Sequence, residues 1–183
     1  MSLTPSTMLP LETSAPDFSL PGIDGKTVSL GNFDGAKAYL IAFICVHCPY
    51  VKHLEDEFAL LALEYQEKGV AVIAINSNDP NHDPDDDLVG MKKQVDEHKF
   101  NFPYLIDETQ EVARDYKAAC TPDLYVFDKS KGLVYHGQFD DTRPGQGHPT
   151  GKDLRAALDA VLDDQPVPAS QKPSTGCNIK WKN

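Results

Sequence analysis

The apolar positions of the chain fall into two kinds of segment, continuous runs and runs with helical spacing. Residues 38–46 and 70–76 are almost entirely apolar, which is typical of strands buried on both faces. Between them, over residues 49–68, apolar side chains recur every three or four positions, and Gly69 follows as a stop signal. This succession predicts a strand, an amphipathic helix and a second strand, which form a right-handed βαβ unit with a parallel sheet.

Shorter patterned segments on both sides of this unit complete the prediction. They are a hairpin over residues 17–30 with a turn at Asp24 and Gly25, helices over 88–98, 108–117 and 152–163, and strands over 102–107, 123–128 and 133–139. No repeat or linker divides the chain, so we expect one domain over residues 15–164. Residues 1–14 should form an extended lead-in, and residues 165–183 a tail that docks because Ile179 and Trp181 offer apolar surface.

The chain is strongly acidic. Acidic side chains outnumber basic ones by 28 to 17, which gives a formal net charge of −11. This charge repels polyphosphate backbones and anionic lipids, so we expect neither nucleic acid nor membranes as partners. The longest apolar run is far shorter than the roughly 20 residues that a membrane helix needs, and no secretory signal is visible, so we expect a cytoplasmic protein. The acidic run over residues 83–87 lacks the glycine and distal glutamate of a calcium loop and should be a solvated helix start.

Two cysteines, Cys45 and Cys48, follow the first buried run at the predicted start of a helix. The helix N-terminus offers unpaired N–H groups and the positive end of the dipole, which favour a thiolate on Cys45. Cys48 can then resolve a mixed disulfide, and Pro49 suits an early helix position because it has no N–H to leave unsatisfied. A protonated His47 would lower the pKa of Cys45 further and make the disulfide more oxidising. The pattern therefore predicts a redox-active pair.

Two other interpretations of the pair stay open. Structural zinc sites normally use four nitrogen or sulfur ligands, and this segment offers Cys45, Cys48, His47 and His53 at short range. A metal carrier that uses the two cysteines and His47 is one alternative, and a redox-silent binding protein with two small buried cysteines is another. In the favoured interpretation we expect no bound metal or cofactor.

Four residues elsewhere extend the candidate site. Thr121 and Pro122 enter a predicted strand, where a proline at a tight turn can be cis. Cys120 lies two residues before that proline and is either a third thiol that relays a disulfide or a buried strand residue. Cys177 in the tail is either a resolving thiol that reaches Cys45 or an anchor of the chain end.

These features resemble the thioredoxin-like superfamily, and within it the peroxiredoxin-like branch called alkyl hydroperoxide reductase/thiol-specific antioxidant, or redoxin. The similarity spans about residues 15–163 and rests on C-V-H-C-P at 45–49, on Thr-Pro before a strand, and on the hairpin A-P-D-F-S-L-P-G-I-D-G-K-T-V-S-L. That hairpin is similar to the opening of peroxiredoxins and of membrane-anchored thiol reductases of cytochrome maturation. The resemblance implies a central mixed sheet flanked by helices, an exposed nucleophile at Cys45, a resolving thiol at Cys48 and a cis proline at Pro122.

The sequence also departs from both family patterns. Peroxiredoxins carry P-x-x-x-T/S-x-x-C, and counting back from Cys48 places Cys45 at the Thr/Ser position and Ile41 at the proline position. No arginine lies around the predicted cis proline, and the thioredoxin tryptophan is replaced by Ile44. The buried acid of thioredoxin corresponds to Tyr39, so proton transfer from Cys48 needs another group. These departures argue against peroxide reduction by the peroxiredoxin mechanism.

The sequence thus predicts a thiol-disulfide oxidoreductase with a thioredoxin-like α/β fold. Its partners would be protein or small-molecule disulfides and thiols, with a thioredoxin- or glutathione-type reductant. A thiol-dependent peroxidase with an antioxidant function is the second enzyme hypothesis, in which Cys45 or Cys48 forms a sulfenic acid that another thiol attacks. Peroxides would then join the list of substrates.

Overall fold

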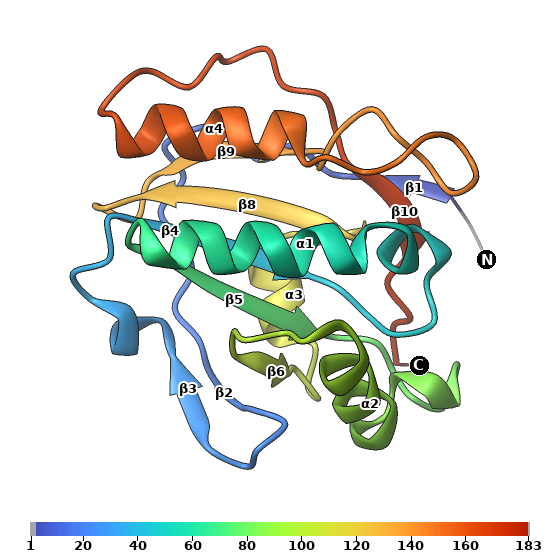
Figure 1. Ribbon diagram of the computed structural model, residues 1–183. Helices are drawn as coiled ribbons and strands as arrows, with labels where there is room; N and C mark the ends of the chain where they lie inside the picture. The colour runs from blue at the N-terminus through green and yellow to red at the C-terminus, as the bar shows by residue number, and fades with distance from the viewer. Residues whose placement is uncertain (1–2, 183) are drawn as a thin grey trace.

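The computed structural model describes residues 3–182 and contains a five-stranded central sheet (Figure 1). The order across the sheet is β6 (Tyr104–Ile106), β5 (Val70–Asn76), β4 (Ala38–Phe43), β8 (Asp123–Asp128) and β9 (Leu133–Gly137). Strands β4, β5 and β6 are parallel, whereas β8 is antiparallel to β4 and β9 is antiparallel to β8. The predicted mixed sheet and its βαβ unit are confirmed.

Helices flank this sheet in two layers (Figure 1). Helices α1 (Pro49–Glu67), α2 (Leu88–His98) and α4 (Lys152–Leu162) contribute to the apolar cluster on one face. Helix α3 (Glu111–Asp115) and the hairpin of β2 (Ser19–Pro21) and β3 (Thr27–Ser29) contribute to the cluster on the other. Two short 3-10 helices, η1 (Leu30–Phe33) and η2 (Pro84–Asp86), lie in the segments that connect these elements. None of the described helices has the length and apolar character that crossing a membrane requires.

The sequence of β4 is apolar without interruption because the strand is buried on both faces. Leu40 and Ala42 pack in the cluster beneath α1 and α4, and Tyr39 and Ile41 pack in the opposite cluster. Successive side chains of a strand point to opposite faces, and here helices cover both faces. Neither face of β4 can therefore carry exposed polar side chains, and the chain leaves the strand directly at the cysteine pair.

Most predicted elements occur close to their predicted ends. Helix α2 and strands β5 and β8 have the predicted bounds. The strand predicted over 102–107 is shorter because Pro103 has no N–H for a ladder, and the helix predicted over 108–117 starts later because Gln110 is in the left-handed conformation. The apolar pattern missed the short strands β1 (Leu3–Pro5), β7 (Cys120–Thr121) and β10 (Thr175–Asn178), which are too short to show a periodicity.

These three short strands form a second sheet with the order β1-β10-β7. Both pairings are antiparallel, and Cys177 lies opposite Leu3 on one side and Thr121 on the other. Strand β10 lies so close to β7 that a Cβ on Gly176 would be 1.9 Å from the carbonyl oxygen of Thr121. The C-terminal segment also contacts α1, so it returns to the end of the central sheet where β4 leads into that helix (Figure 1).

Replacing Gly176 with alanine should unseat β10, because the added methyl group would overlap the Thr121 carbonyl. We expect Gly176→Ala to lower the free energy of unfolding by about 1–3 kcal/mol, the usual cost of an overpacked contact. Urea unfolding followed by tryptophan fluorescence measures this loss, since Trp181 follows β10. Gly31→Ala is the matched control, because its Cβ would have no neighbour closer than 3.9 Å. Equal midpoints for the two variants would contradict the close packing of β10 on β7.

Candidate active site

The structure brings four of the predicted site residues together at the end of β4. Cys45 follows that strand, and Cys48 is the N-cap of α1. The Cys45 Sγ lies 3.2 Å from the Thr121 Oγ1, and the Cys48 Sγ lies 3.1 Å from the Thr121 carbonyl oxygen. The peptide bond between Thr121 and Pro122 is cis, as the resemblance implied. Thr121 is therefore the residue that contacts both sulfurs.

Both cysteines of the pair are fully buried. Cys45 and Cys48 each have 0% of their surface exposed. The resemblance implied an exposed nucleophile at Cys45, and this expectation is wrong. Cys45 is enclosed by Thr121 and by His47, whose Nδ1 lies 3.8 Å from its Sγ, while Cys177 of β10 lies against Cys48. A disulfide substrate can reach the pair only after a segment of this covering moves.

The electrostatics of the pair favour negative charge on Cys48. Hydrogen bonds from Cys45, from the Cys177 thiol and N–H, and from the Val51 N–H lower the pKa of Cys48 to about 5, against the effect of burial. Burial, the hydrogen bond to Cys48 and the Asp86 carboxylate raise the pKa of Cys45 well above its ordinary value. The predicted low pKa of Cys45 is therefore wrong. The start of α1 does favour a thiolate, but on its N-cap residue Cys48, where the Val51 N–H contributes to the lower pKa.

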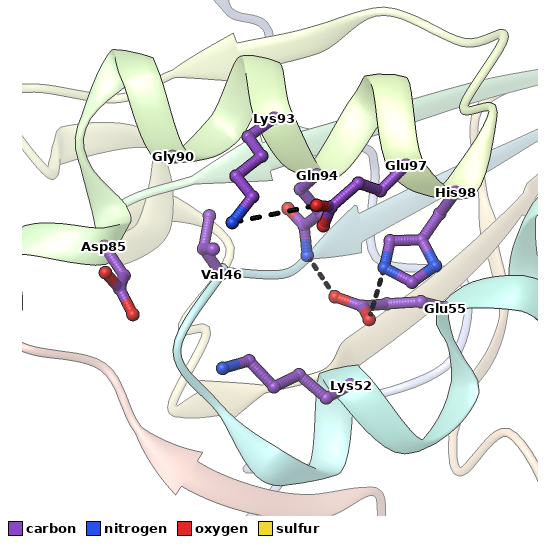
Figure 2. A pocket seen from close by; sticks show the side chains of 9 residues that line it. All are labelled: Val46, Lys52, Glu55, Asp85, Gly90, Lys93, Gln94, Glu97 and His98. Carbon is purple, nitrogen blue, oxygen red and sulfur yellow. Dashed lines mark hydrogen bonds and ion pairs between the residues drawn. The ribbon is translucent and has the colours of Figure 1, made fainter.

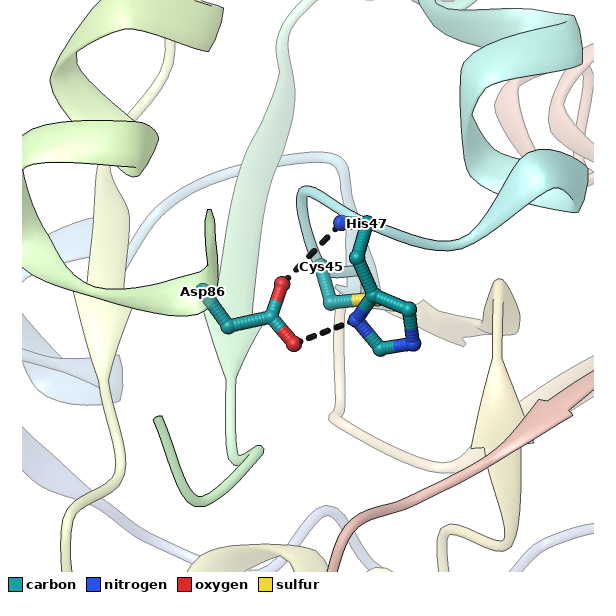
Figure 3. A group of neighbouring side chains, drawn as sticks. All are labelled: Cys45, His47 and Asp86. Carbon is teal, nitrogen blue, oxygen red and sulfur yellow. Dashed lines mark hydrogen bonds and ion pairs between the residues drawn. The ribbon is translucent and has the colours of Figure 1, made fainter. Parts of the chain in front are cut away.

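His47 forms a buried ion pair that the sequence did not predict (Figure 3). Its Nδ1 lies 2.6 Å from the Asp86 Oδ2, and the Asp86 Oδ1 accepts hydrogen bonds from the N–H groups of Val46 and His47. The bond to Asp86 raises the pKa of His47, and in turn His47, Asn78 and Val46 lower the pKa of Asp86 against the effect of burial. The charge of His47 is thus neutralised by Asp86 and does not act on Cys45 alone.

Asp86 also corrects the interpretation of the acidic run over residues 83–87. That run was expected to be a solvated helix start, but Asp86 is only 4% exposed and its carboxylate binds the backbone of the cysteine loop. Asp83 and Asp87 do cap helices, as acidic residues at such starts commonly do. A run of similar residues gives no signal of which member turns inward, so the sequence could not single out Asp86.

Cys45, His47 and Asp86 also form a group that could hold a metal ion (Figure 3). Their ligand atoms lie within 4.8 Å of one another, and thiolate, imidazole and carboxylate are common zinc ligands that would leave a fourth position open. This set differs from the predicted one, which used Cys48 in place of Asp86. His53 lies elsewhere, with its Nε2 2.9 Å from the Thr142 Oγ1. A metal would also have to displace the proton that the Nδ1 of His47 shares with Asp86.

A polar cavity of about 320 Å³ lies between α1 and α2 beside the pair (Figure 2). Gln94 donates hydrogen bonds to the Cys45 carbonyl oxygen and to Glu55, and the His98 Nε2 lies 3.0 Å from the other Glu55 oxygen. Burial raises the pKa of Glu55. Sequence reasoning missed this wall of the site, although Glu55 sits one position after Leu54 on the buried stripe of α1, where a carboxylate is unusual.

The two remaining cysteines differ in their relation to the pair. Cys120 is buried, its Sγ lies 3.6 Å from the Pro122 carbonyl oxygen, and burial raises its pKa far above the ordinary value. Cys177 is also buried, but its Sγ lies 2.8 Å from the Sγ of Cys48. The sequence suggested that Cys177 could reach Cys45, whereas the structure places it against Cys48.

A mixed sheet between helix layers, with a cysteine pair at a helix start facing a cis proline, defines a thioredoxin-like protein. The family model described as "AhpC/TSA family" matches residues 11–136, and the chain belongs to that family. The chain is 26% identical to the thiol-disulfide oxidoreductase ResA of Bacillus thuringiensis subsp. konkukian over 135 residues, and this alignment covers 70% of each chain. This similarity supports the function of a thiol-disulfide oxidoreductase.

Solved structures agree with this classification of the fold. An uncharacterized conserved protein from Geobacillus kaustophilus matches with a TM-score of 0.96 and 52% identity, over 100% of this chain and 97% of that one. A putative thiol:disulfide interchange protein DsbE from Chlorobium tepidum matches with a TM-score of 0.68 and 21% identity, over 85% of this chain and 99% of that one. The predicted thioredoxin-like fold is confirmed.

The reduced protein should hold a thiolate on Cys48 at neutral pH, because this thiol has a pKa of about 5. The ultraviolet absorbance of the thiolate should rise as the pH of a wild-type sample passes through about 5. Cys120→Ser should show the same rise, because the raised pKa of the Cys120 thiol keeps it protonated in this range. The step should be absent in Cys48→Ser. A step that persists in Cys48→Ser and vanishes in Cys45→Ser would instead assign the charge to Cys45.

Replacing Asp86 with asparagine should lower the pKa of His47 toward the ordinary value of about 6.5, because the carboxylate stabilises the imidazolium. Because the pKa of His47 is raised, its protonation stabilises the fold at pH values below about 6.5. This stabilisation is lost as the pH rises through the pKa of His47 in the folded state. The lowered pKa of Asp86 stabilises the fold above its ordinary value of 3.8. Asp86→Asn should therefore lose most stability between about pH 4 and about pH 6.5, and less at about pH 9.

Two measurements check this expectation. An NMR titration of the histidine ring follows the pKa of His47, and urea unfolding at acidic and alkaline pH follows the stability. Asp85→Asn removes a neighbouring exposed carboxylate and is the control, with an expected change within about 0.5 kcal/mol at both pH values. A pKa of His47 that is unchanged in Asp86→Asn would show that the ion pair does not exist in solution.

Proposed function

We propose that this protein is a thiol-disulfide oxidoreductase whose redox pair is Cys45 and Cys48. The observation that carries the proposal is the arrangement of the two sulfurs. Both lie at the start of α1 and within 3.2 Å of an oxygen of Thr121, and negative charge is favoured on Cys48. A thiolate next to a second thiol is the arrangement that thiol-disulfide exchange requires. The similarity to ResA supports the same reaction.

The exchange uses the charge on Cys48 first. The Cys48 thiolate attacks one sulfur of a substrate disulfide, and the other substrate sulfur leaves as a thiolate that takes up a proton. Cys45 then attacks the Cys48 side of the mixed disulfide, gives its proton to the second leaving thiolate, and closes the Cys45–Cys48 bond. The substrate gains two electrons and the protein loses two, and a thioredoxin- or glutathione-type thiol restores the dithiol by the reverse exchange.

His47, Thr121 and Asp86 position this pair. The Thr121 carbonyl oxygen accepts from Cys48 when that sulfur is a thiol, and its hydroxyl lies beside Cys45. Asp86 holds the loop from Val46 to His47 by two backbone hydrogen bonds. Burial, the hydrogen bond to Cys48 and the negative charge of Asp86 together raise the pKa of Cys45, so Cys45 keeps its proton until Cys48 has reacted.

A thiol peroxidase is the second candidate, and the low pKa of Cys48 is the observation that favours it. The thiolate would attack a peroxide oxygen, release an alcohol or water, and become a sulfenic acid that Cys45 or Cys177 condenses with, releasing water. The peroxiredoxin reaction needs an arginine near the active cysteine, and the described contacts of the three arginines lie elsewhere. Arg114 lies over the ring of Trp181, and Arg143 contacts Gln138, Asp140 and Thr142. Arg155 contacts Tyr65, Glu57, Glu64 and Thr150. None of these contacts places a guanidinium beside the sulfurs, so disulfide exchange is the favoured reaction.

The test is reduction of a protein disulfide, such as that of insulin, by dithiothreitol with catalytic amounts of the protein. Cys45→Ser and Cys48→Ser should each lower the rate to the uncatalysed level, and Cys120→Ser should retain the wild-type rate. With a labelled disulfide peptide, Cys45→Ser/Cys177→Ser should trap a mixed disulfide on Cys48, because neither thiol that neighbours Cys48 remains. Full activity in both single variants would overturn the proposal, and faster reaction with peroxide than with any disulfide would favour the peroxidase.

A further inference from the structure

The C-terminal strand is built onto the cysteine site by contacts on both sides of Cys177. Before it, the Ser174 Oγ donates a hydrogen bond of 2.6 Å to the Pro122 carbonyl oxygen. After it, the Ile179 N–H donates to the Ala119 carbonyl oxygen over 3.1 Å. The pairing of Cys177 with Thr121 lies between these bonds. The segment is therefore fixed on the edge of β7 that faces the two sulfurs.

The packing leaves little freedom for the Cys177 sulfur. Gly176 passes the Thr121 carbonyl at a distance that only glycine tolerates, and this approach brings β10 down onto the site. Cys177 is 1% exposed, and its Sγ lies 2.8 Å from the Cys48 Sγ, closer than an ordinary non-bonded contact of two sulfurs. A disulfide bond is about 2.05 Å long, so only a small shift of the side chains separates this contact from a bond.

We propose that Cys177 is a second disulfide partner of Cys48, so that one disulfide can occupy two registers, Cys45–Cys48 or Cys48–Cys177. The inference rests on the proposed redox role of Cys48, and it adds a third residue to the exchange reaction. Cys177 lies on the protein's own C-terminal strand β10, and its thiol contacts Cys48 directly.

The conversion between the registers is an internal thiol-disulfide exchange. The Cys177 sulfur attacks the Cys48 sulfur of the Cys45–Cys48 disulfide, the Cys48–Cys177 bond forms and the Cys45–Cys48 bond breaks. Cys45 leaves with the electron pair and takes up the proton that Cys177 gives away. One disulfide and one thiol are present before and after, so the step needs no external oxidant or reductant.

The contacts at the site favour attack at Cys48 over attack at Cys45. In the reduced protein, burial raises the pKa of Cys177 to about 12, so it remains a thiol hydrogen-bonded to the Cys48 thiolate. Cys45 lies beside Thr121 and His47, and no described contact joins it to Cys177. Cys48 is thus the sulfur that both neighbouring thiols contact, and it belongs to either disulfide.

The two registers differ in whether a substrate can reach the cysteine pair beneath β10. In the Cys45–Cys48 register, hydrogen bonds and packing alone hold β10 over the site, so a substrate can displace it. In the Cys48–Cys177 register, a covalent bond ties β10 to the start of α1 and leaves Cys45 as a free thiol. The second register is therefore a closed oxidised form of the enzyme.

The test is a disulfide map of Cys45→Ser after equilibration with oxidised glutathione. Trypsin cleaves after lysine and arginine except before proline, so it separates residues 38–52, 118–129 and 156–180 and places Cys48, Cys120 and Cys177 on different peptides. We expect a monomer that has lost two thiols, with the peptides of Cys48 and Cys177 joined. Cys45→Ser/Cys120→Ser should give the same linked peptide, and Cys45→Ser/Cys177→Ser should give only glutathione on Cys48.

A Cys45→Ser protein that holds glutathione on Cys48 while Cys177 stays free would overturn the inference. Wild-type protein mapped in the same way is the second measurement, because it does not depend on the folding of a variant. Cys45 and Cys48 share the peptide 38–52, so fragmentation of the linked peptide must show which of them is bonded to Cys177. A Cys48–Cys177 bond should accompany the Cys45–Cys48 bond, and its absence at every glutathione ratio, or a Cys45–Cys177 bond in its place, counts against the inference. Cys177→Ser tests the proposed function separately, since it must still form the Cys45–Cys48 disulfide.

Discussion

Every residue of β4 is buried, and its alternate side chains enter two separate apolar clusters, so the strand is stable only when layers cover it from both sides. This requirement sets the course of the chain after the strand. Helix α1 packs back over one face with Val51, Leu54 and Phe58, and the chain must turn between residues 44 and 48 to do so. The cysteine pair lies at this turn. Its place at the sheet end and helix start thus follows from the burial of β4.

The pair is electrically asymmetric although its two residues are chemically identical. Cys48 is surrounded by donors, and Cys45 lies near the buried carboxylate of Asp86. That carboxylate is tolerated inside an acidic chain because backbone N–H groups, Asn78 and His47 satisfy its oxygens. A dipole argument treats the helix start as one region of positive potential. In the structure the Val51 N–H of the first turn helps to lower the pKa of Cys48, whereas burial first, and then the hydrogen bond to Cys48 and the Asp86 carboxylate, raise the pKa of Cys45.

Thr121 connects the β1-β10-β7 sheet with the cysteine pair at the end of the central sheet. Its side chain and carbonyl oxygen contact the two sulfurs, and its backbone pairs with Cys177. The edge of the site is therefore occupied by the protein's own C-terminal strand, and Gly176 is needed there because no side chain fits beneath it. A site closed in this way must open to act on a large substrate. The same closure keeps three thiols away from solvent, where oxidation is faster.

The sequence by itself determined the central sheet, the helices that cover it and the place of the cysteine pair between a strand end and a helix start, because burial on two faces and helical spacing leave periodic patterns that can be counted. It also located Thr121 and Pro122, since a proline at a strand entry has few other roles. It could not determine which acidic residue turns inward, that Cys177 meets Cys48, or that the short strands β1, β7 and β10 pair. These features join segments more than 30 residues apart. Such contacts leave no periodicity in the chain, and only the packing of the completed sheet and helices decides them.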